Sequence, residues 1–224
     1  MRAAVLAGGL GTRLRPLTFF VPKPLVHVAG RPLIDHILAW LKANGVREIA
    51  VIGHYMQDLL AGYLAEFFPD VVFIKSPRLL GTAGQLYYAR GWATGGDLVV
   101  VNADVLTNLD LKMPAELHKA KKAQLTIVAT PQTASLRFGV LEIEGDMLKA
   151  WREKPTFSYI TSTGVYIASS QVVERLREEF LDMDSLARSL IPNVAVYVAR
   201  EAFFHDVGTL GDLPKAQSVK ELRP

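Results

Sequence analysis

The sequence has 224 residues, half of them hydrophobic and 21% charged, which is the composition of a folded domain rather than a disordered chain. Its formal net charge of +3 is too small to predict a nucleic-acid-binding surface. The absence of cysteine excludes disulfides and thiolate metal sites, and no apolar segment is long enough for a signal peptide or a membrane span. We therefore expect one domain over residues 1–224 of a cytoplasmic protein, with neither nucleic acid nor membrane as a partner.

Strand and helix patterns alternate through the first half of the chain. Because such alternation is typical of βαβ units, it predicts a mostly parallel sheet covered by helices. The run from Leu98 to Val101 is apolar throughout, as expected for a central strand that is buried on both faces. The predicted strands are 3–6, 48–52, 71–74 and 98–101, and the predicted helices are 33–41 (ending at Asn44-Gly45), 56–68, 83–92 and 114–122.

The second half is expected to contain a hairpin and to complete the same domain. Strand patterns over 139–143 and 147–151 flank Gly145-Asp146, a pair that is typical of tight hairpin turns. The chain shows no linker, repeat or low-complexity tract, so we interpret it as one mixed α/β domain. Further strands are predicted at 124–130, 164–168 and 194–198, and further helices at 170–180 and 211–222.

A glycine-rich turn follows the first predicted strand. Its sequence is Leu6-Ala7-Gly8-Gly9-Leu10-Gly11-Thr12-Arg13, and Lys23 follows within Pro22-Lys23-Pro24. Three glycines let the backbone turn tightly and bring its N–H groups close to an anion. Because Thr12, Arg13 and Lys23 add a hydroxyl and two cations, the pattern indicates a triphosphate site.

Two other phosphate-binding motifs do not fit this turn. A P-loop requires Lys-Ser or Lys-Thr after its last glycine, whereas Thr12-Arg13 follows Gly11 here. A dinucleotide fingerprint requires a third small residue three places after its second glycine, where this chain has Leu14. Taken alone, the turn could also be a flexible segment whose arginines are merely solvated.

Two acidic residues are candidate metal ligands. Asp104 follows the apolar strand in Asn102-Ala103-Asp104, and Asp206 ends a short apolar run before Gly208. Since ligands of open α/β sheets lie beyond the carboxyl ends of the strands, we expect both near the glycine-rich turn. A carboxylate there would repel a triphosphate unless a cation intervened, and Mg²⁺ binds carboxylates together with phosphate oxygens. The alternative for Asp104 is to cap the next turn.

Two further segments offer polar or small groups. In Trp151-Arg152-Glu153-Lys154-Pro155, Glu153 suits sugar hydroxyls and Lys154 suits a phosphate, although an exposed ion-pair edge would have the same pattern. In Leu80-Gly81-Thr82-Ala83-Gly84, small residues would let a flat ring lie against the backbone, or they form an ordinary helix start. We interpret the first half of the chain as nucleotide-binding and the second half as acceptor-binding.

In this order, the motifs resemble those of the sugar-1-phosphate nucleotidylyltransferases. This family includes mannose-1-phosphate guanylyltransferases and glucose-1-phosphate thymidylyl- and uridylyltransferases. The resemblance implies a Rossmann-like α/β domain of three layers around a mixed, mostly parallel central sheet, without the C-terminal β-helix that many members add. The matching stretches are GGLGTRLRPLT at 8–18, PKPL at 22–25, LGTAG at 80–84, NADVLTNLDL at 102–111, FGV at 138–140, EKP at 153–155, STGVYI at 162–167 and DVGT at 206–209.

The resemblance also implies roles for individual residues. Arg13, Lys23 and Asp104 would be catalytic, and Asp104 and Asp206 would bind Mg²⁺. The sugar phosphate would be held by Gly139, Glu153, Lys154, Ser162 and Thr163. The nucleotide would be held by Leu6, Ala7, Gly8, Gly9, Gly11, Thr12, Arg13, Lys23, Gly81 and Thr82.

The implied reaction joins a nucleoside triphosphate to a sugar-1-phosphate and releases pyrophosphate, with GTP and mannose-1-phosphate as the expected pair. A dTTP- or UTP-using glucose-1-phosphate nucleotidylyltransferase is the first alternative, and a nucleotide-sugar-binding regulatory homologue with little activity is the second. The two substrates would be the partners, and homo-oligomers are common in the family. Two residues depart from the family pattern: Ala103 replaces a glycine before the metal-binding aspartate, and Ser162 stands where asparagine is common.

Overall fold

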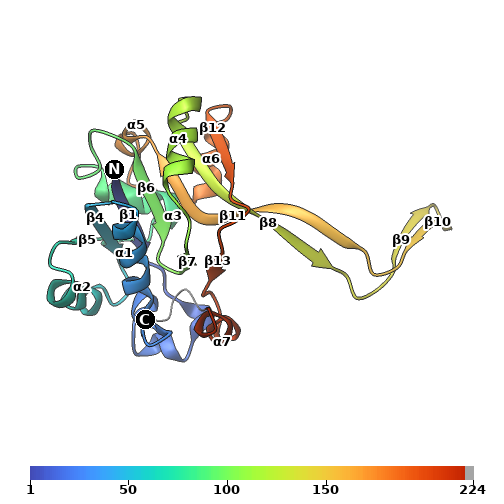
Figure 1. Cartoon of the computed structure of the whole chain (residues 1–224), viewed down its shortest axis with the longest axis horizontal. Coiled ribbons are helices and arrows are strands. Elements are labelled where there is room, and N and C mark those ends of the chain that lie inside the picture. Colours follow the sequence, from blue (N-terminus) through green and yellow to red (C-terminus); the bar gives the residue numbers. More distant parts are fainter. Residues whose placement is uncertain (220–224) are drawn as a thin grey trace.

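The computed structural model describes residues 1–219 and has a seven-stranded sheet at its centre (Figure 1). From one edge to the other, its strands are β12 (Val194–Val198), β8 (Leu125–Ser135), β11 (Thr156–Ala168), β6 (Leu98–Asn102), β1 (Arg2–Ala7), β4 (Glu48–Gly53) and β5 (Val72–Lys75). The strands β6, β1, β4 and β5 are parallel neighbours, and β12 is parallel to β8. Only β11 runs antiparallel to both of its neighbours, so the sheet is mixed and mostly parallel, as predicted.

The central strands are apolar because both faces of the sheet are buried. Successive side chains of a strand point to opposite faces. Along β1, Ala3 and Val5 therefore join one hydrophobic cluster, and Ala4 and Leu6 join another on the other face. All four side chains are at most 9% exposed. This arrangement confirms the prediction of a central sheet that is covered on both sides.

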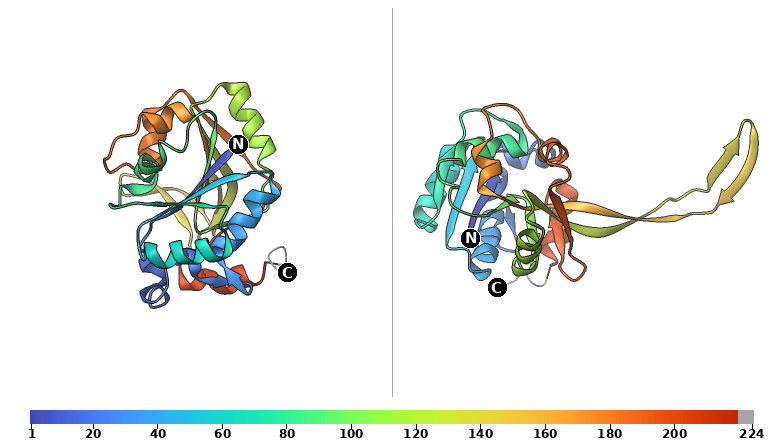
Figure 2. Two further views of the ribbon diagram at one scale, coloured as in Figure 1. Left: turned by 90° about the vertical axis from the view of Figure 1, so that its left-hand side faces the viewer. Right: turned by 90° about the horizontal axis from the view of Figure 1, so that it is seen from above.

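Helices form the two outer layers (Figure 2). On one face, α1 (Leu33–Ala43) and α2 (Gln57–Phe67) contribute to the first cluster, and α4 (Lys112–Lys121) packs on β8 and β12. On the other face, α3 (Gly81–Gly84), α5 (Ser170–Glu174) and α6 (Met183–Ser189) contribute to the second cluster. None of the helices within residues 1–219 is long and apolar enough to cross a membrane.

Three predicted helices differ from the observed elements. The predicted helix 83–92 is a single α-helical turn, α3, followed by the 3-10 helix η4 (Gln85–Ala89). The predicted helix 170–180 ends with α5, because residues 177–180 are all exposed and have no apolar face to bury, and α6 was not predicted. The predicted helix 211–222 is the 3-10 helix η5 (Leu210–Asp212) and the short α7 (Leu213–Gln217); residues 220–222 lie outside the described range.

Short elements surround the carboxyl ends of the parallel strands. Strand β13 (Phe204–Asp206) pairs antiparallel with β7 (Val105–Thr107), directly after β6. Between β1 and α1, the chain forms the 3-10 helices η1 (Thr12–Leu14), η2 (Leu17–Phe19) and η3 (Lys23–Leu25) and the hairpin of β2 (His27–Val28) and β3 (Arg31–Pro32). In a third hydrophobic cluster, residues of these elements pack against α7.

Strands β8 and β11 continue beyond the sheet as a two-stranded arm (Figure 1). They were predicted to span 124–130 and 164–168, but they remain paired as far as Ser135 and Thr156. The end of the arm is the predicted hairpin, formed by β9 (Val140–Glu144) and β10 (Met147–Arg152). Its turn contains Gly145 with a φ of 58°, a left-handed conformation that glycine adopts without strain.

We expect the stability of the fold to decrease below pH ~6.5 because of His36, which is 4% exposed in α1. Its Nδ1 accepts a hydrogen bond from Arg31 Nε (3.2 Å) and its Nε2 donates one to the Val28 carbonyl (2.8 Å), so the ring is neutral. Burial lowers the pKa of His36, and the nearby Arg31 charge lowers it too. The unfolded chain therefore binds the proton more readily, and protonation favours unfolding.

Urea unfolding at about pH 8 and about pH 5 measures this effect. The His36→Gln variant should lose less stability between the two pH values than the wild type. The exposed His27 provides the control, because His27→Gln should leave the wild-type difference in place. An equal pH dependence in wild type and His36→Gln would contradict the assignment.

Candidate active site

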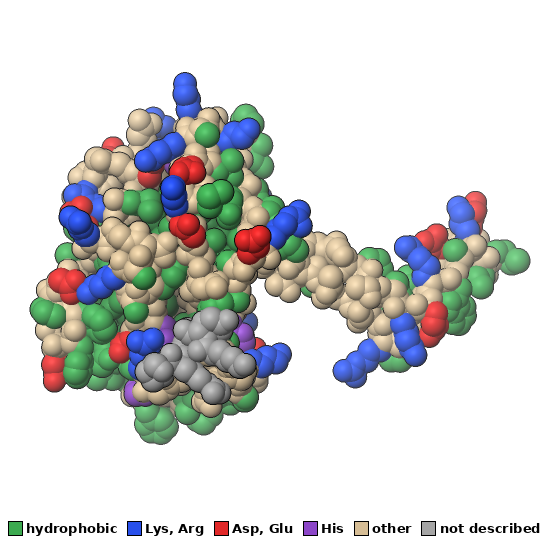
Figure 3. All heavy atoms as spheres, viewed as in Figure 1, with side chains coloured by type: hydrophobic (Ala, Val, Ile, Leu, Met, Phe, Trp, Pro, Cys, Tyr) green, Lys and Arg blue, Asp and Glu red, His purple; other side chains and the backbone are tan. Residues whose placement is uncertain are grey.

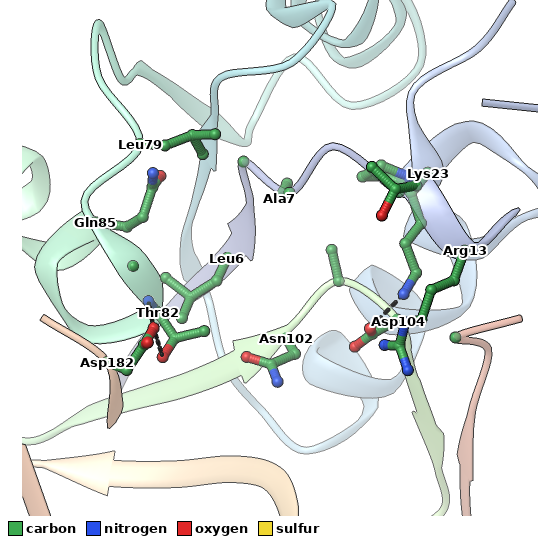
Figure 4. A pocket seen from close by; sticks show the side chains of 18 residues that line it. Leu6, Ala7, Arg13, Lys23, Leu79, Thr82, Gln85, Asn102, Asp104 and Asp182 are labelled. Atoms are coloured by element: carbon green, nitrogen blue, oxygen red, sulfur yellow. Dashed lines mark hydrogen bonds and ion pairs between the residues drawn. The ribbon is translucent and has the colours of Figure 1, made fainter. Parts of the chain in front are cut away.

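The carboxyl ends of β1 and β6 open onto a cavity of about 350 Å³. Because these strands are parallel neighbours, the segments that follow them meet at one edge of the sheet. Figure 4 shows the glycine-rich turn, the Asp104 segment and the Thr82 segment around this cavity. All residues predicted to hold the nucleotide line it: Leu6, Ala7, Gly8, Gly9, Gly11, Thr12, Arg13, Lys23, Gly81 and Thr82.

The conformation of the turn explains the glycine at position 11. Gly11 has a φ of 61°, and its carbonyl accepts hydrogen bonds from the Leu14 N–H (2.9 Å) and the Thr18 hydroxyl (2.8 Å). A Cβ at this position would lie 2.8 Å from the Thr18 methyl group. The left-handed backbone and the close contact both require glycine, and they aim the following Thr12-Arg13 segment at the cavity.

Asp104 and Lys23 form an ion pair on the wall of the cavity. The Lys23 ammonium lies 2.5 Å from Asp104 Oδ2, and the two side chains are 13% and 21% exposed. Asp104 follows β6 by two residues, and the Ala103 N–H donates to the Leu6 carbonyl at 3.0 Å, which ties this segment to the end of β1. The alanine that replaces the family glycine is accommodated, because Ala103 does not adopt a positive φ.

Asp206, the second predicted metal ligand, lies beside Asp104. The pairing of β13 with β7 sets Asp206 opposite Val105, and the Val207 N–H donates to the Asp104 carbonyl at 3.0 Å. Burial, followed by the charge of Asp104, raises the pKa of Asp206 to about 6 against the opposing charges of Lys23 and Arg13. The charge of Asp104 thus disfavours a second negative charge on Asp206.

These carboxylates fit a divalent cation. A cation between them would relieve their repulsion, and Mg²⁺ typically binds one or two carboxylates together with phosphate oxygens and water. Within residues 1–219, no group of three or more His, Asp or Glu side chains is arranged to hold a metal by itself. Substrate phosphates and water would therefore have to complete the coordination of a metal held by Asp104 and Asp206.

Arg13 lies next to this pair but forms no ion pair with any described residue. It projects from η1 toward Asp104 and Lys23 in Figure 4, and a Cβ on Gly208 would lie 3.2 Å from its Nη2 atom. An exposed guanidinium without a carboxylate partner can bind phosphate oxygens in a bidentate manner. Arg13 is therefore placed to bind an anion at the boundary of the cavity.

A second cavity of about 400 Å³ adjoins the first, and Arg13, Asn102 and Asp104 line both. The predicted sugar residues Ser162 and Thr163 line the second cavity, on β11. The Ser162 hydroxyl donates to the Tyr166 hydroxyl at 3.1 Å, and the Thr163 hydroxyl donates to the Val128 carbonyl at 2.9 Å. The rest of its lining includes Thr130, Gln132, Thr161, Gly164, Tyr166, Phe204 and Asp206.

The other predicted sugar-phosphate residues are not brought to this cavity. Gly139, Glu153 and Lys154 flank β9 and β10, which lie at the far end of the arm (Figure 1). Glu153 Oε2 accepts a hydrogen bond from Trp151 Nε1 at 3.0 Å, and Gly139 packs against the same indole. The continuous pairing of β8 with β11 holds the hairpin away from the body of its own chain. The contact of Gly139, Glu153 and Lys154 with a sugar phosphate stays a prediction.

Three polar side chains of the first cavity were not among the predicted site residues. Asn102 and Gln85 each have a buried amide oxygen without a hydrogen-bond partner in residues 1–219. Asp182, which precedes α6, accepts a hydrogen bond from the Thr82 N–H at 3.1 Å. The position of Asn102 at the end of an apolar strand could have indicated its role, but Gln85 and Asp182 lie in no recognisable motif.

Asp182→Ala is expected to weaken nucleotide binding about 10-fold with little change in kcat. Asp182 Oδ1 holds the Thr82 N–H, and the Thr82 hydroxyl accepts a hydrogen bond from the Met183 N–H at 2.8 Å. These bonds fix the turn at Gly81, whose φ is 74° and which has no room for a Cβ beside Leu181. The KM for the triphosphate is the measurement. Asp184→Ala, at an exposed position two residues further along, is the control and should leave this KM unchanged.

The fold and this site define a nucleotidyltransferase domain, and the comparison of the sequence with protein families agrees. The profile of the nucleotidyl transferase family matches residues 2–221, almost the entire chain. The chain therefore belongs to this family, as its sequence motifs predicted.

Individual relatives are similar at a more specific level. The chain is 31% identical to mannose-1-phosphate guanylyltransferase 1 of Arabidopsis thaliana, over 87% of this chain and 56% of that protein, so it spans about half the length of such relatives. It is 29% identical to the D-glycero-alpha-D-manno-heptose 1-phosphate guanylyltransferase of Aneurinibacillus thermoaerophilus, over 100% of this chain and 99% of that one. The crystal structure of HddC from Yersinia pseudotuberculosis complexed with GMP-PN has a TM-score of 0.76 and 26% identity, and the match covers 96% and 97% of the two chains.

Proposed function

We propose that this chain is a sugar-1-phosphate nucleotidylyltransferase that uses GTP and mannose-1-phosphate. The observation that carries the proposal is the wall of Arg13, Asn102 and Asp104 that two adjoining cavities share. The cavity at the glycine-rich turn suits a triphosphate, and the cavity lined by hydroxyl and amide groups suits a sugar. Two bound substrates would meet at the shared wall, in the proximity that transfer between them requires.

The attacking atom would be a phosphate oxygen of the sugar-1-phosphate. A phosphomonoester has a second pKa near ~6, so it is already largely dianionic at neutral pH and needs no general base. Its oxygen forms a bond to the α-phosphorus of the triphosphate, and the bond from that phosphorus to the bridging oxygen breaks. The electron pair leaves with pyrophosphate. The site accordingly contains cations and carboxylates rather than a His–Asp pair.

The side chains around the wall would position the two polyanions and offset their repulsion. The backbone of the turn from Gly8 to Thr12 would bind the triphosphate, and Arg13 would stabilise the departing pyrophosphate. Lys23 would face the α-phosphate. When bound by Asp104 and Asp206, Mg²⁺ would neutralise phosphate charge next to these residues.

The relatives support the choice of base and sugar. The plant and bacterial relatives are named as guanylyltransferases of mannose-1-phosphate and of a manno-configured heptose 1-phosphate. At the edge of the first cavity, the apolar Leu79 and the amide of Gln85 would surround the base. A dTTP- or UTP-using enzyme for glucose-1-phosphate stays the alternative within the same family, and the cytoplasmic location stays a prediction.

A screen of pyrophosphate release tests the proposal. ATP, GTP, CTP, UTP and dTTP would each be combined with mannose-1-phosphate, glucose-1-phosphate and a heptose 1-phosphate in the presence of Mg²⁺. GTP with mannose-1-phosphate should give the highest kcat/KM. A higher value with dTTP or UTP and glucose-1-phosphate would favour the alternative. Tight binding of a nucleotide-sugar without turnover of any pair would favour a regulatory homologue.

A further inference from the structure

The arm projects far from the body of the molecule although it has only two strands. Its strands pair continuously from Ser162↔Ala129 to Thr156↔Ser135. At ~3.3 Å per residue, Thr156 lies about 17 Å beyond Thr161, which lines the second cavity. The hairpin of β9 and β10 extends further still (Figure 2). A two-stranded hairpin is marginally stable alone in water, so this one requires a surface to pack against.

One face of the hairpin is apolar and uncovered. The register pairs Leu141 with Trp151 and Ile143 with Leu148, so these four side chains lie on the same face. Their exposed fractions are 49%, 60%, 68% and 57%. Figure 3 shows apolar side chains at this end of the molecule, with charged ones beside them. A contiguous exposed apolar face of this kind marks an interaction surface.

The neck of the arm carries two cations that have no partner. The Leu136 N–H donates to the Pro155 carbonyl at 3.1 Å, which brings the neighbouring residues Arg137 and Lys154 to the same neck. Neither forms an ion pair within residues 1–219, whereas Arg152 and Lys149 on the same hairpin are paired with Glu142 and Glu144. The neck therefore presents two free positive charges next to the apolar face.

The second cavity has little positive charge. Its lining includes the carboxylates of Asp104 and Asp206, and Arg13 is its only basic residue among those described. Under the proposed function, Mg²⁺ would offset the two carboxylates and Arg13 would bind the departing pyrophosphate, so no described side-chain cation of this cavity is left for the phosphate of the sugar. The free cations on the neck would supply the missing charge, but the pairing of β8 with β11 keeps them away from the cavity of their own chain.

We propose that two copies of this chain exchange arms, so that the hairpin of each packs on the other and Lys154 completes the partner's second cavity. A two-fold axis between antiparallel arms would bring the neck of each arm to the base of the other, where Gln132 and Thr161 line that cavity. One self-complementary contact thus covers both apolar faces and completes both sites. This inference rests on the proposed function for the role of Lys154, but its geometry can be tested without turnover.

The first test measures mass and proximity. Light scattering should give a dimer for the wild type and a monomer for Trp151→Glu, while Leu59→Glu, the same change at an exposed position of α2, should stay dimeric. Because the chain has no cysteine, Lys154→Cys and Gln132→Cys can be prepared separately, mixed and treated with a bismaleimide. A covalent dimer is expected from this mixture and not from Lys154→Cys mixed with Lys121→Cys. A wild-type monomer, or a dimer without the Gln132 cross-link, would overturn the proposal.

The second test uses activity. Lys154→Ala and Asp104→Asn should each be nearly inactive, and a mixture unfolded and refolded together should regain about a quarter of wild-type activity, because half of the dimers are mixed and one of their two sites is intact. If each arm served its own chain, the mixture would stay inactive, which would contradict arm exchange. If the wild type itself turned over no substrate pair, the proposed function would fail, and the cross-link alone would decide whether the arms are exchanged.

Discussion

Replacing Asp104 with asparagine should lower the rate of nucleotidyl transfer about 10³-fold while the fold is retained. Asparagine keeps the shape of the side chain but removes its charge, and with it one of the two carboxylates that would hold Mg²⁺. The change also leaves the Lys23 ammonium without the carboxylate that lies 2.5 Å from it. The expected result is a loss of kcat together with a higher Mg²⁺ concentration for half-maximal activity.

Pyrophosphate release as a function of Mg²⁺ concentration measures both quantities, and thermal unfolding verifies the fold. Asp58→Asn is the control, because that carboxylate is 82% exposed and its pair with Lys75 contributes little. Asp206→Asn should resemble Asp104→Asn in its Mg²⁺ dependence. If Asp104→Asn retained the wild-type rate at low Mg²⁺, Asp104 would not be a metal ligand.

The parts of the fold that the sequence predicted well are those with strong local patterns. The apolar run at 98–101 became a central strand, and Asp104 directly after it lies at the sheet edge where parallel strands end. The glycine-rich turn was predicted for the same reason, because Gly11 needs a left-handed backbone that few other residues adopt. Local sequence therefore specified the side of the first cavity that the glycine-rich turn and Asp104 form.

The parts that were missed depend on contacts between distant segments. The extension of β11 over 156–160 comprises exposed residues that pair with β8 away from the core, although Phe157 and Tyr159 alternate with polar residues in the pattern of a strand. Asp182 reaches the first cavity only because α6 packs against α3, from a segment about 100 residues away in the sequence. The motif that contains Lys154 predicts a contact with the sugar phosphate. A motif cannot indicate whether that contact forms within one chain or between two copies.

Arg13→Ala is the second substitution with a large expected effect. Arg13 lines both cavities and forms no ion pair within the described residues, so its charge is available to the departing pyrophosphate. Because this interaction strengthens as charge develops on the leaving group, its loss should lower kcat about 10²–10³-fold and change the KM for the sugar phosphate little. Arg13→Lys should recover part of the rate, since it keeps the charge but loses the bidentate geometry.

Arg15→Ala is a matched control two residues away. Arg15 lines neither cavity, and its guanidinium lies over the Phe19 ring, 4.8 Å from the centroid. It should keep wild-type kcat, and both variants should keep the wild-type melting temperature because neither removes an ion pair. The reverse reaction gives an independent measurement, because Arg13→Ala should raise the KM for pyrophosphate at least as much as it lowers the forward rate constant. An unchanged KM for pyrophosphate would mean that Arg13 does not contact the leaving group, and its role would then be confined to the sugar phosphate in the second cavity.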